Sequence, residues 1–89
     1  MIDEDINIGQ VVRSTKGRDK GKYFIVIGKL DDNHLLIVDG DIRKIEKPKK
    51  KKVKHLMKLD IISTETIERL NSNKEITNAF IRKELKNWV

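Results

Sequence analysis

Residues 8–39 read IGQVVRSTKGRDKGKYFIVIGKLDDNHLLIVD, and this stretch decides the fold of the chain. It contains two apolar runs, YFIVI and LLIV, that are rich in β-branched and aromatic residues. Short runs of this kind, bounded by Gly, Asp and Asn, are typical of strands that tight turns connect. We therefore predict strands at 23–30 and 34–39, with a hairpin turn at 31–33 between them.

Further strands are predicted on both sides of this hairpin. Residues 10–14 precede it, and residues 42–46 alternate apolar with charged side chains, as a half-exposed strand does. A fifth strand at 55–59 would close a barrel against the first. Five short strands predict a mainly β fold, a small SH3-like barrel. Within it we expect Phe24 and either Val11 or Val12 in the core.

The pattern changes from strand-like to helical in the last third of the chain. Ser63 is a suitable N-cap for a short helix over 63–70. Ser72 and Glu75 form a capping box, which predicts that a second helix starts near Asn73. The sequence thus divides into a barrel over 1–59 and a helical tail over 60–89.

Two arrangements of the helical tail are open at this point. Its apolar face either packs on the barrel or presents Ile81, Leu85 and Trp88 to a partner.

Composition places the chain among small basic proteins. It has 89 residues, a net charge of +6 and no cysteine, which excludes a disulfide framework and a thiolate zinc site. No apolar run reaches the roughly 20 residues that a membrane-spanning helix needs. Residues 1–5 are acidic, which argues against a secretory signal or a transit peptide. We therefore expect a cytoplasmic protein.

The positive charge is concentrated in one segment. Residues 41–59 hold nine Lys/Arg and two Asp/Glu, whereas the rest of the chain is close to neutral. A basic arm over 47–54 would neutralise phosphates and so give affinity for nucleic acid without reading its sequence. The alternative interpretation is a solvated linker that keeps the chain soluble.

The loop over 15–22 is the second segment that could contact nucleic acid. Gly17 and Gly21 can adopt positive φ, and the backbone amides and cations around them could hold a phosphate. The alternative is that both glycines serve only the turn. The loop lacks the pattern of a nucleotide-hydrolysing P-loop. We expect a weak local ion pair between Arg18 and Asp19.

The order VVRS, GRDKGK and FIVI resembles the KOW motif, a strand–loop–strand unit of ribosomal proteins and of NusG-type transcription elongation factors. LIVDG and KHL further on resemble the fourteen-e family of large-subunit ribosomal proteins. The resemblance covers residues 8–59 and has no counterpart for the tail. It implies an SH3-like fold, RNA binding and association with the ribosome. In KOW domains the first loop commonly meets RNA or protein.

The candidate RNA-binding residues come from the loop, the lysine run and their flanks. They are Lys16, Gly17, Arg18, Lys20, Gly21, Lys22, Arg43, Lys47, Lys49, Lys50, Lys51, Lys52, Lys54 and His55. Tyr23 is the one candidate for stacking on a base, so recognition of shape and backbone is favoured.

The function expected from the sequence is therefore non-enzymatic RNA binding by a monomer, with ribosomal RNA as the partner and a role in translation or ribosome assembly. His34 and His55 have no partner at the spacing of a catalytic or metal site, so neither an enzyme nor a cofactor is expected. The alternative is a module that binds RNA polymerase or a ribosomal protein through the barrel and the helical tail. A polybasic membrane anchor is disfavoured, because no lipidation motif or basic amphipathic helix accompanies the lysines.

Overall fold

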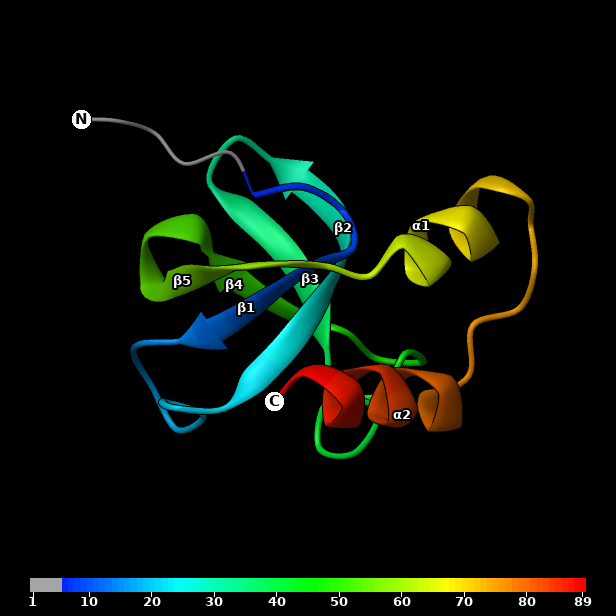
Figure 1. Ribbon diagram of the computed structural model, residues 1–89. Helices are drawn as coiled ribbons and strands as arrows, with labels where there is room; N and C mark the ends of the chain where they lie inside the picture. The colour runs from blue at the N-terminus through cyan, green and yellow to red at the C-terminus, as the bar shows by residue number, and fades with distance from the viewer. Residues whose placement is uncertain (1–5) are drawn as a thin grey trace.

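One antiparallel sheet and two helices make up the fold (Figure 1). The computed structural model describes residues 6–89, so the acidic start of the chain, residues 1–5, lies outside the described residues. In chain order the elements are β1 (Gln10–Ser14), β2 (Tyr23–Asp31), β3 (His34–Val38), β4 (Lys49–Lys52), the 3-10 turn η1 (Val53–His55), β5 (Leu56–Ile62), α1 (Thr64–Asn71) and α2 (Asn78–Trp88).

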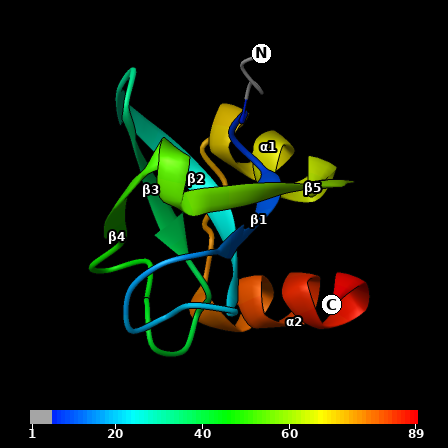
Figure 2. The same ribbon diagram turned by 90° about the vertical axis from the view of Figure 1, so that its left-hand side faces the viewer.

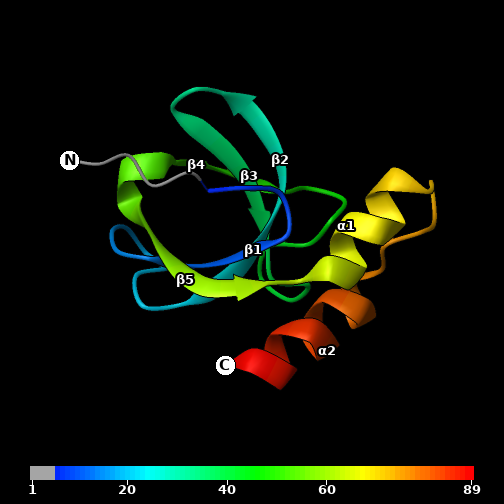
Figure 3. The ribbon, with the colours of Figure 1, turned by 45° about the horizontal axis from the view of Figure 1, so that its top comes forward.

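The strands lie in the order β4-β3-β2-β1-β5, and every neighbouring pair is antiparallel. The sheet curls strongly, and η1 leads directly from edge strand β4 into edge strand β5 (Figure 3). The result is a small barrel-like fold with two C-terminal helices. The predicted fold class is therefore confirmed, as is the pairing of the fifth strand with the first. The register of β2 with β3 shifts between Val26 and Gly28.

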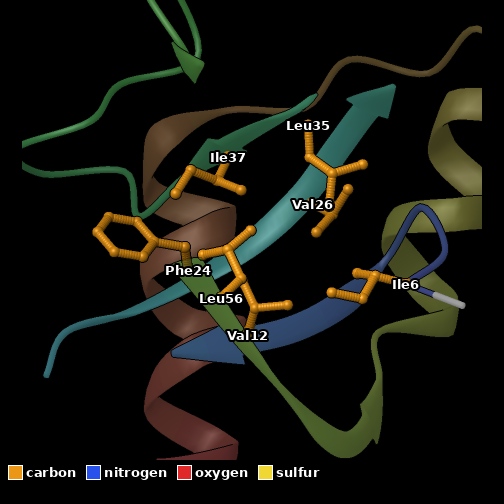
Figure 4. Close-up of a cluster of buried hydrophobic side chains, with 7 residues drawn as sticks. All are labelled: Ile6, Val12, Phe24, Val26, Leu35, Ile37 and Leu56. Atoms are coloured by element: carbon orange, nitrogen blue, oxygen red, sulfur yellow. The ribbon is translucent and has the colours of Figure 1, made fainter. Parts of the chain in front are cut away.

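The inner core lies inside the curled sheet. It consists of the buried side chains drawn in Figure 4, which come from β1, β2, β3, β5 and the segment before β1. Val12 and Phe24 are cross-strand partners and share this inner face. Phe24 is fully buried, as predicted, and its ring lies at one end of the cluster (Figure 4).

A second core covers the outer face of the same strands. Val11 pairs with Ile25, and Ile25 pairs with Val38, so these three side chains share the face opposite to Val12. α2 lies across this face (Figure 2), where its Ile81 and Leu85 are buried. Both valines of β1 are thus buried, each in a different core. Burial on two faces explains why YFIVI is continuously apolar.

The strand predicted at 42–46 is wrong. These residues form turns in the loop between β3 and β4. The Asp39 carboxylate accepts hydrogen bonds from the amides of Asp41 and Arg43, at 2.9 and 2.8 Å, and the Asn78 side chain accepts one from Ile45. Because these side chains satisfy the backbone locally, the segment does not join the sheet. The fourth strand is instead the lysine run, directly after Pro48.

Of the two predicted helices, the first is confirmed and the second starts later than expected. The hydroxyl of Ser63 caps α1 by accepting from the amide of Thr66. Ser72 ends α1 instead of starting α2, because its hydroxyl donates to the carbonyl of Glu68. Asn73 follows with a φ of 58°, which no helix continues. The cap of α2 is Thr77, which accepts from the amide of Phe80.

Candidate nucleic-acid interface

The loop over 15–22 is a tightly closed turn between β1 and β2. Gly17 and Gly21 have φ values of 89° and 87°, which the sequence predicted from their lack of a Cβ. Ser14 closes the loop by donating its amide to the carbonyl of Lys22 and accepting from the amide of Gly21. The four cations of the loop remain exposed. They are Lys16, Arg18, Lys20 and Lys22.

The one carboxylate of this loop points inward. Asp19 is 6% exposed, and its Oδ1 accepts hydrogen bonds from Lys51 Nζ and Ser14 Oγ, both at 2.9 Å. The predicted ion pair with Arg18 is therefore wrong, because Asp19 pairs with a lysine 32 residues away. Burial alone would raise the pKa of Asp19, but the hydrogen bonds from Lys51 and Ser14 outweigh it and hold the pKa below its ordinary value.

Lys51 is the interior member of the lysine run. It lies opposite Leu35, which faces the inner core, so its side chain points inward as well. Its ammonium donates to the carbonyl of Lys16 at 2.7 Å and to Asp19 at 2.9 Å, and the residue is 8% exposed. The sequence placed Lys51 among the RNA-binding lysines. The structure corrects this, because its charge is already neutralised inside the protein.

The other lysines of the run point outward from an ordered strand. Lys50 and Lys52 are exposed and lie opposite Leu36 and His34, on the face that alternates with Lys51. Lys47 and Lys54, on either side of β4, are exposed as well, and Lys49 is half-buried. The segment predicted as a basic arm is therefore an edge strand with its flanks, and the barrel fixes the spacing of its charges.

Cations from the loop and from the β4–η1 segment gather around His55. The Thr15 amide donates to the His55 carbonyl, which ties the two segments together. Partial burial of the ring, followed by the positive charges of four lysines, lowers the pKa of His55 from its ordinary value of 6.5. These lysines are Lys54, Lys16, Lys52 and Lys51. The positive surroundings of His55 therefore favour the neutral form of its imidazole.

Three further predicted residues meet in an open cleft of about 280 Å³. They are Arg18 and Lys22 from the first loop and Arg43 from the β3–β4 loop, and Asp19, Phe24 and Ile42 complete the lining. We call this the basic cleft. The sequence missed Asp19 and Ile42, since no local pattern shows which loops meet in space.

The loop over 15–22 and η1 lie on the side of the barrel away from α1 (Figure 1), whereas the β3–β4 loop, which carries Arg43, contacts the start of α2 through Ile45 and Asn78. Tyr23 does not join the exposed cations, because it packs, partly buried, against the outer core under α2. His34 lies on the hairpin, with its Nδ1 3.0 Å from an Asp31 oxygen. The helical tail packs on the sheet through Ile81 and Leu85 and leaves only Trp88 of its three proposed anchors exposed.

Among residues 6–89, no three His, Asp or Glu side chains gather closely enough to hold a metal ion. No helix of the described chain has the length and apolar character needed to cross a membrane.

A curated protein of Bacillus subtilis (strain 168), "Putative ribosome-binding protein YbzG", is 33% identical to this chain over 73 residues. The match covers 82% of this chain and 99% of the relative. The chain belongs to the same family as YbzG. The YbzG relationship extends over nearly the full length of the relative, so it is not confined to one motif. No family model matches the chain.

Proposed function

We propose that this chain is a non-enzymatic, KOW-type RNA-binding protein of the cytoplasm that associates with the ribosome by holding the phosphate backbone of ribosomal RNA. The similarity to YbzG, which is named as a putative ribosome-binding protein, supports the ribosome as the partner. The exposed cations of the loop over 15–22 and of the β4–η1 segment, which together form the basic end of the barrel, support RNA as the part of the ribosome that the chain contacts. A role in translation or ribosome assembly follows from this partner.

One observation carries the proposal, namely the separation of charges at the basic end. The only carboxylate of the first loop is turned inward and neutralised by Lys51. The four cations of the loop and Lys50 and Lys52 of β4 are left exposed to solvent. A surface meant only for solubility has no need to bury its one acidic group, whereas a surface for phosphates gains from it.

The mechanism is electrostatic and depends on rigidity. Lysine ammonium groups act as point charges that follow a phosphate backbone without reading bases. The contacts of Lys51 with Lys16 and Asp19 tie the loop to β4, so the charges of both segments are already in place before RNA arrives. Such preorganisation reduces the entropy that binding would otherwise cost.

The alternative, a module for RNA polymerase or a ribosomal protein, has weaker support. It relied on a helical tail that offers Ile81, Leu85 and Trp88, and two of these side chains are buried against the sheet. An apolar contact of this kind would also depend little on salt.

The test is binding of the full chain to ribosomal RNA over a range of salt concentrations. We expect log Kd to rise linearly with log salt, with a slope of about 0.7 to 0.9 per phosphate contacted. The variant Lys52→Glu/Lys54→Glu should bind more weakly to all RNAs alike. The matched control, Lys83→Glu/Lys86→Glu, makes the same charge change on exposed positions of α2 and should bind normally. Binding that ignores salt, or that both variants weaken equally, would overturn the proposal.

A further inference from the structure

β5 is an edge strand that pairs with β1 alone among the described residues. The other edge strand, β4, is a run of four lysines directly after Pro48, and proteins use lysine and proline to protect an edge from further pairing. β5 lacks this protection. It reads LMKLDII, and its Met57 and Ile62 are 44% and 43% exposed. Within residues 6–89, β5 therefore offers the edge that is best suited to accept another strand.

The backbone groups of Lys58 and Asp60 face the free edge of β5. Hydrogen bonds toward β1 and its flanks come from odd-numbered residues. The bonded groups are the carbonyls of His55, Leu59 and Ile61 and the amide of Ser63. The register with β1 shifts in this region, but the side chain of Gln10 takes two of these carbonyls, so the alternation continues. Because successive residues of a strand direct their backbone groups to opposite edges, the even-numbered residues point away from β1.

The sequence of β5 is complementary to itself in one antiparallel register. When two copies pair about Leu59, Lys58 of each copy lies opposite Asp60 of the other, and Met57 lies opposite Ile61. The neighbouring registers that keep the same backbone bonds place Lys58 opposite Lys58, or Asp60 opposite Asp60. Opposite charges directly across an antiparallel pair stabilise it, whereas like charges destabilise it. Charge therefore selects the register that is centred on Leu59.

We propose that two copies of this chain form a symmetric dimer by antiparallel pairing of their β5 strands. A two-fold interface requires a surface that is complementary to itself, and β5 meets this requirement. The C-terminal end of α2 lies beside β5 (Figure 2, Figure 3), so Trp88, which is 51% exposed, would flank the seam as an apolar anchor. The dimer replaces the monomer that was expected from the sequence. The inference goes beyond the proposed RNA binding and does not depend on it.

The test is sedimentation equilibrium of the full chain over a range of protein concentrations. We expect a dissociation constant on the order of 10 μM, because a single pair of strands forms a small interface. Lys58→Asp sets aspartate against aspartate in both charge pairs, and Asp60→Lys sets lysine against lysine. Each variant alone should dimerise about tenfold more weakly, or less still. An equal mixture of the two variants restores both opposite-charge pairs and should associate like the native chain.

The matched control is Lys29→Asp, which makes the same charge change at an exposed position of β2. It should dimerise like the native chain, and thermal unfolding should verify that every variant is folded. A native chain that stays monomeric far above the expected dissociation constant would overturn the inference. Dimers that persist in both Lys58→Asp and Asp60→Lys, or a mixture of the two that fails to associate, would overturn it too. RNA binding is measured separately by the salt titration, so these outcomes leave the proposed function intact.

Discussion

The two faces of β4 carry the same residue type and differ in every physical respect. On the inner face, Lys51 is buried, paired with Asp19 and bonded to the first loop. On the outer face, Lys50 and Lys52 are exposed and free to meet an external anion. One lysine of the run therefore stabilises the fold, and in the proposed function its outward-facing neighbours supply the charge that meets RNA.

Replacing the inner lysine should have the largest effect. Lys51→Met leaves the Asp19 carboxylate buried with only Ser14 as a partner, and breaking a buried pair in this way costs about 3 kcal/mol. Lys50→Met removes the same charge from the outer face and should change the free energy of unfolding by less than about 0.5 kcal/mol. Urea unfolding of the two variants measures the difference. Equal stabilities would contradict the division between the faces.

Substitution of the two glycines of the first loop should also lower the stability to different extents. Both have positive φ, so an added Cβ costs about 1–2 kcal/mol at either position. At Gly17 the Cβ would also lie 3.2 Å from Lys51 Nζ, whereas at Gly21 it would meet nothing within 4 Å. We expect Gly17→Ala to lower the melting temperature more than Gly21→Ala. A larger loss in Gly21→Ala would show that Lys51 is not held against the loop.

A smaller loss in the free energy of unfolding should appear at acidic pH. Because the pKa of Asp19 in the folded chain lies below its ordinary value of 3.8, ionised Asp19 stabilises the fold above that pH. This contribution should be lost as the pH falls from about 4 through the lowered pKa. The free energy of unfolding, measured between neutral pH and pH 3, should therefore fall less steeply in Asp19→Asn, which begins from a lower stability. Parallel curves for the two proteins would exclude a lowered pKa of Asp19.

Some of these elements could be predicted from the sequence alone and others could not. The strands around YFIVI and LLIV were predictable because their side chains combine apolar character with turn residues at their ends. β4 was not, since four lysines have neither alternation nor β propensity, and only pairing with β3 makes them a strand. The capping box at Ser72 was misleading because the αL conformation of Asn73 ends one helix before the next begins.

The candidate site was predictable in composition but not in geometry. Clustering of charge identified the lysine run, and Gly17, Gly21 and the KOW resemblance identified the loop, both without structural information. The pairing of Asp19 with Lys51, and the meeting of Arg18 with Arg43 in one cleft, join residues that are distant in the chain. No local pattern encodes such contacts, because they result from the curl of the sheet and from the β3–β4 loop.

In the proposed function, the outward-facing lysines of the β4–η1 segment bind the ribosome through RNA. Sedimentation of cell lysates on sucrose gradients at low and high salt tests this binding. We predict that the native chain and Lys83→Glu/Lys86→Glu migrate with the large subunit at low salt and leave it at high salt, while Lys52→Glu/Lys54→Glu stays at the top. Continued migration of Lys52→Glu/Lys54→Glu with the ribosome, or absence of the native chain from every ribosomal fraction, would contradict the claim.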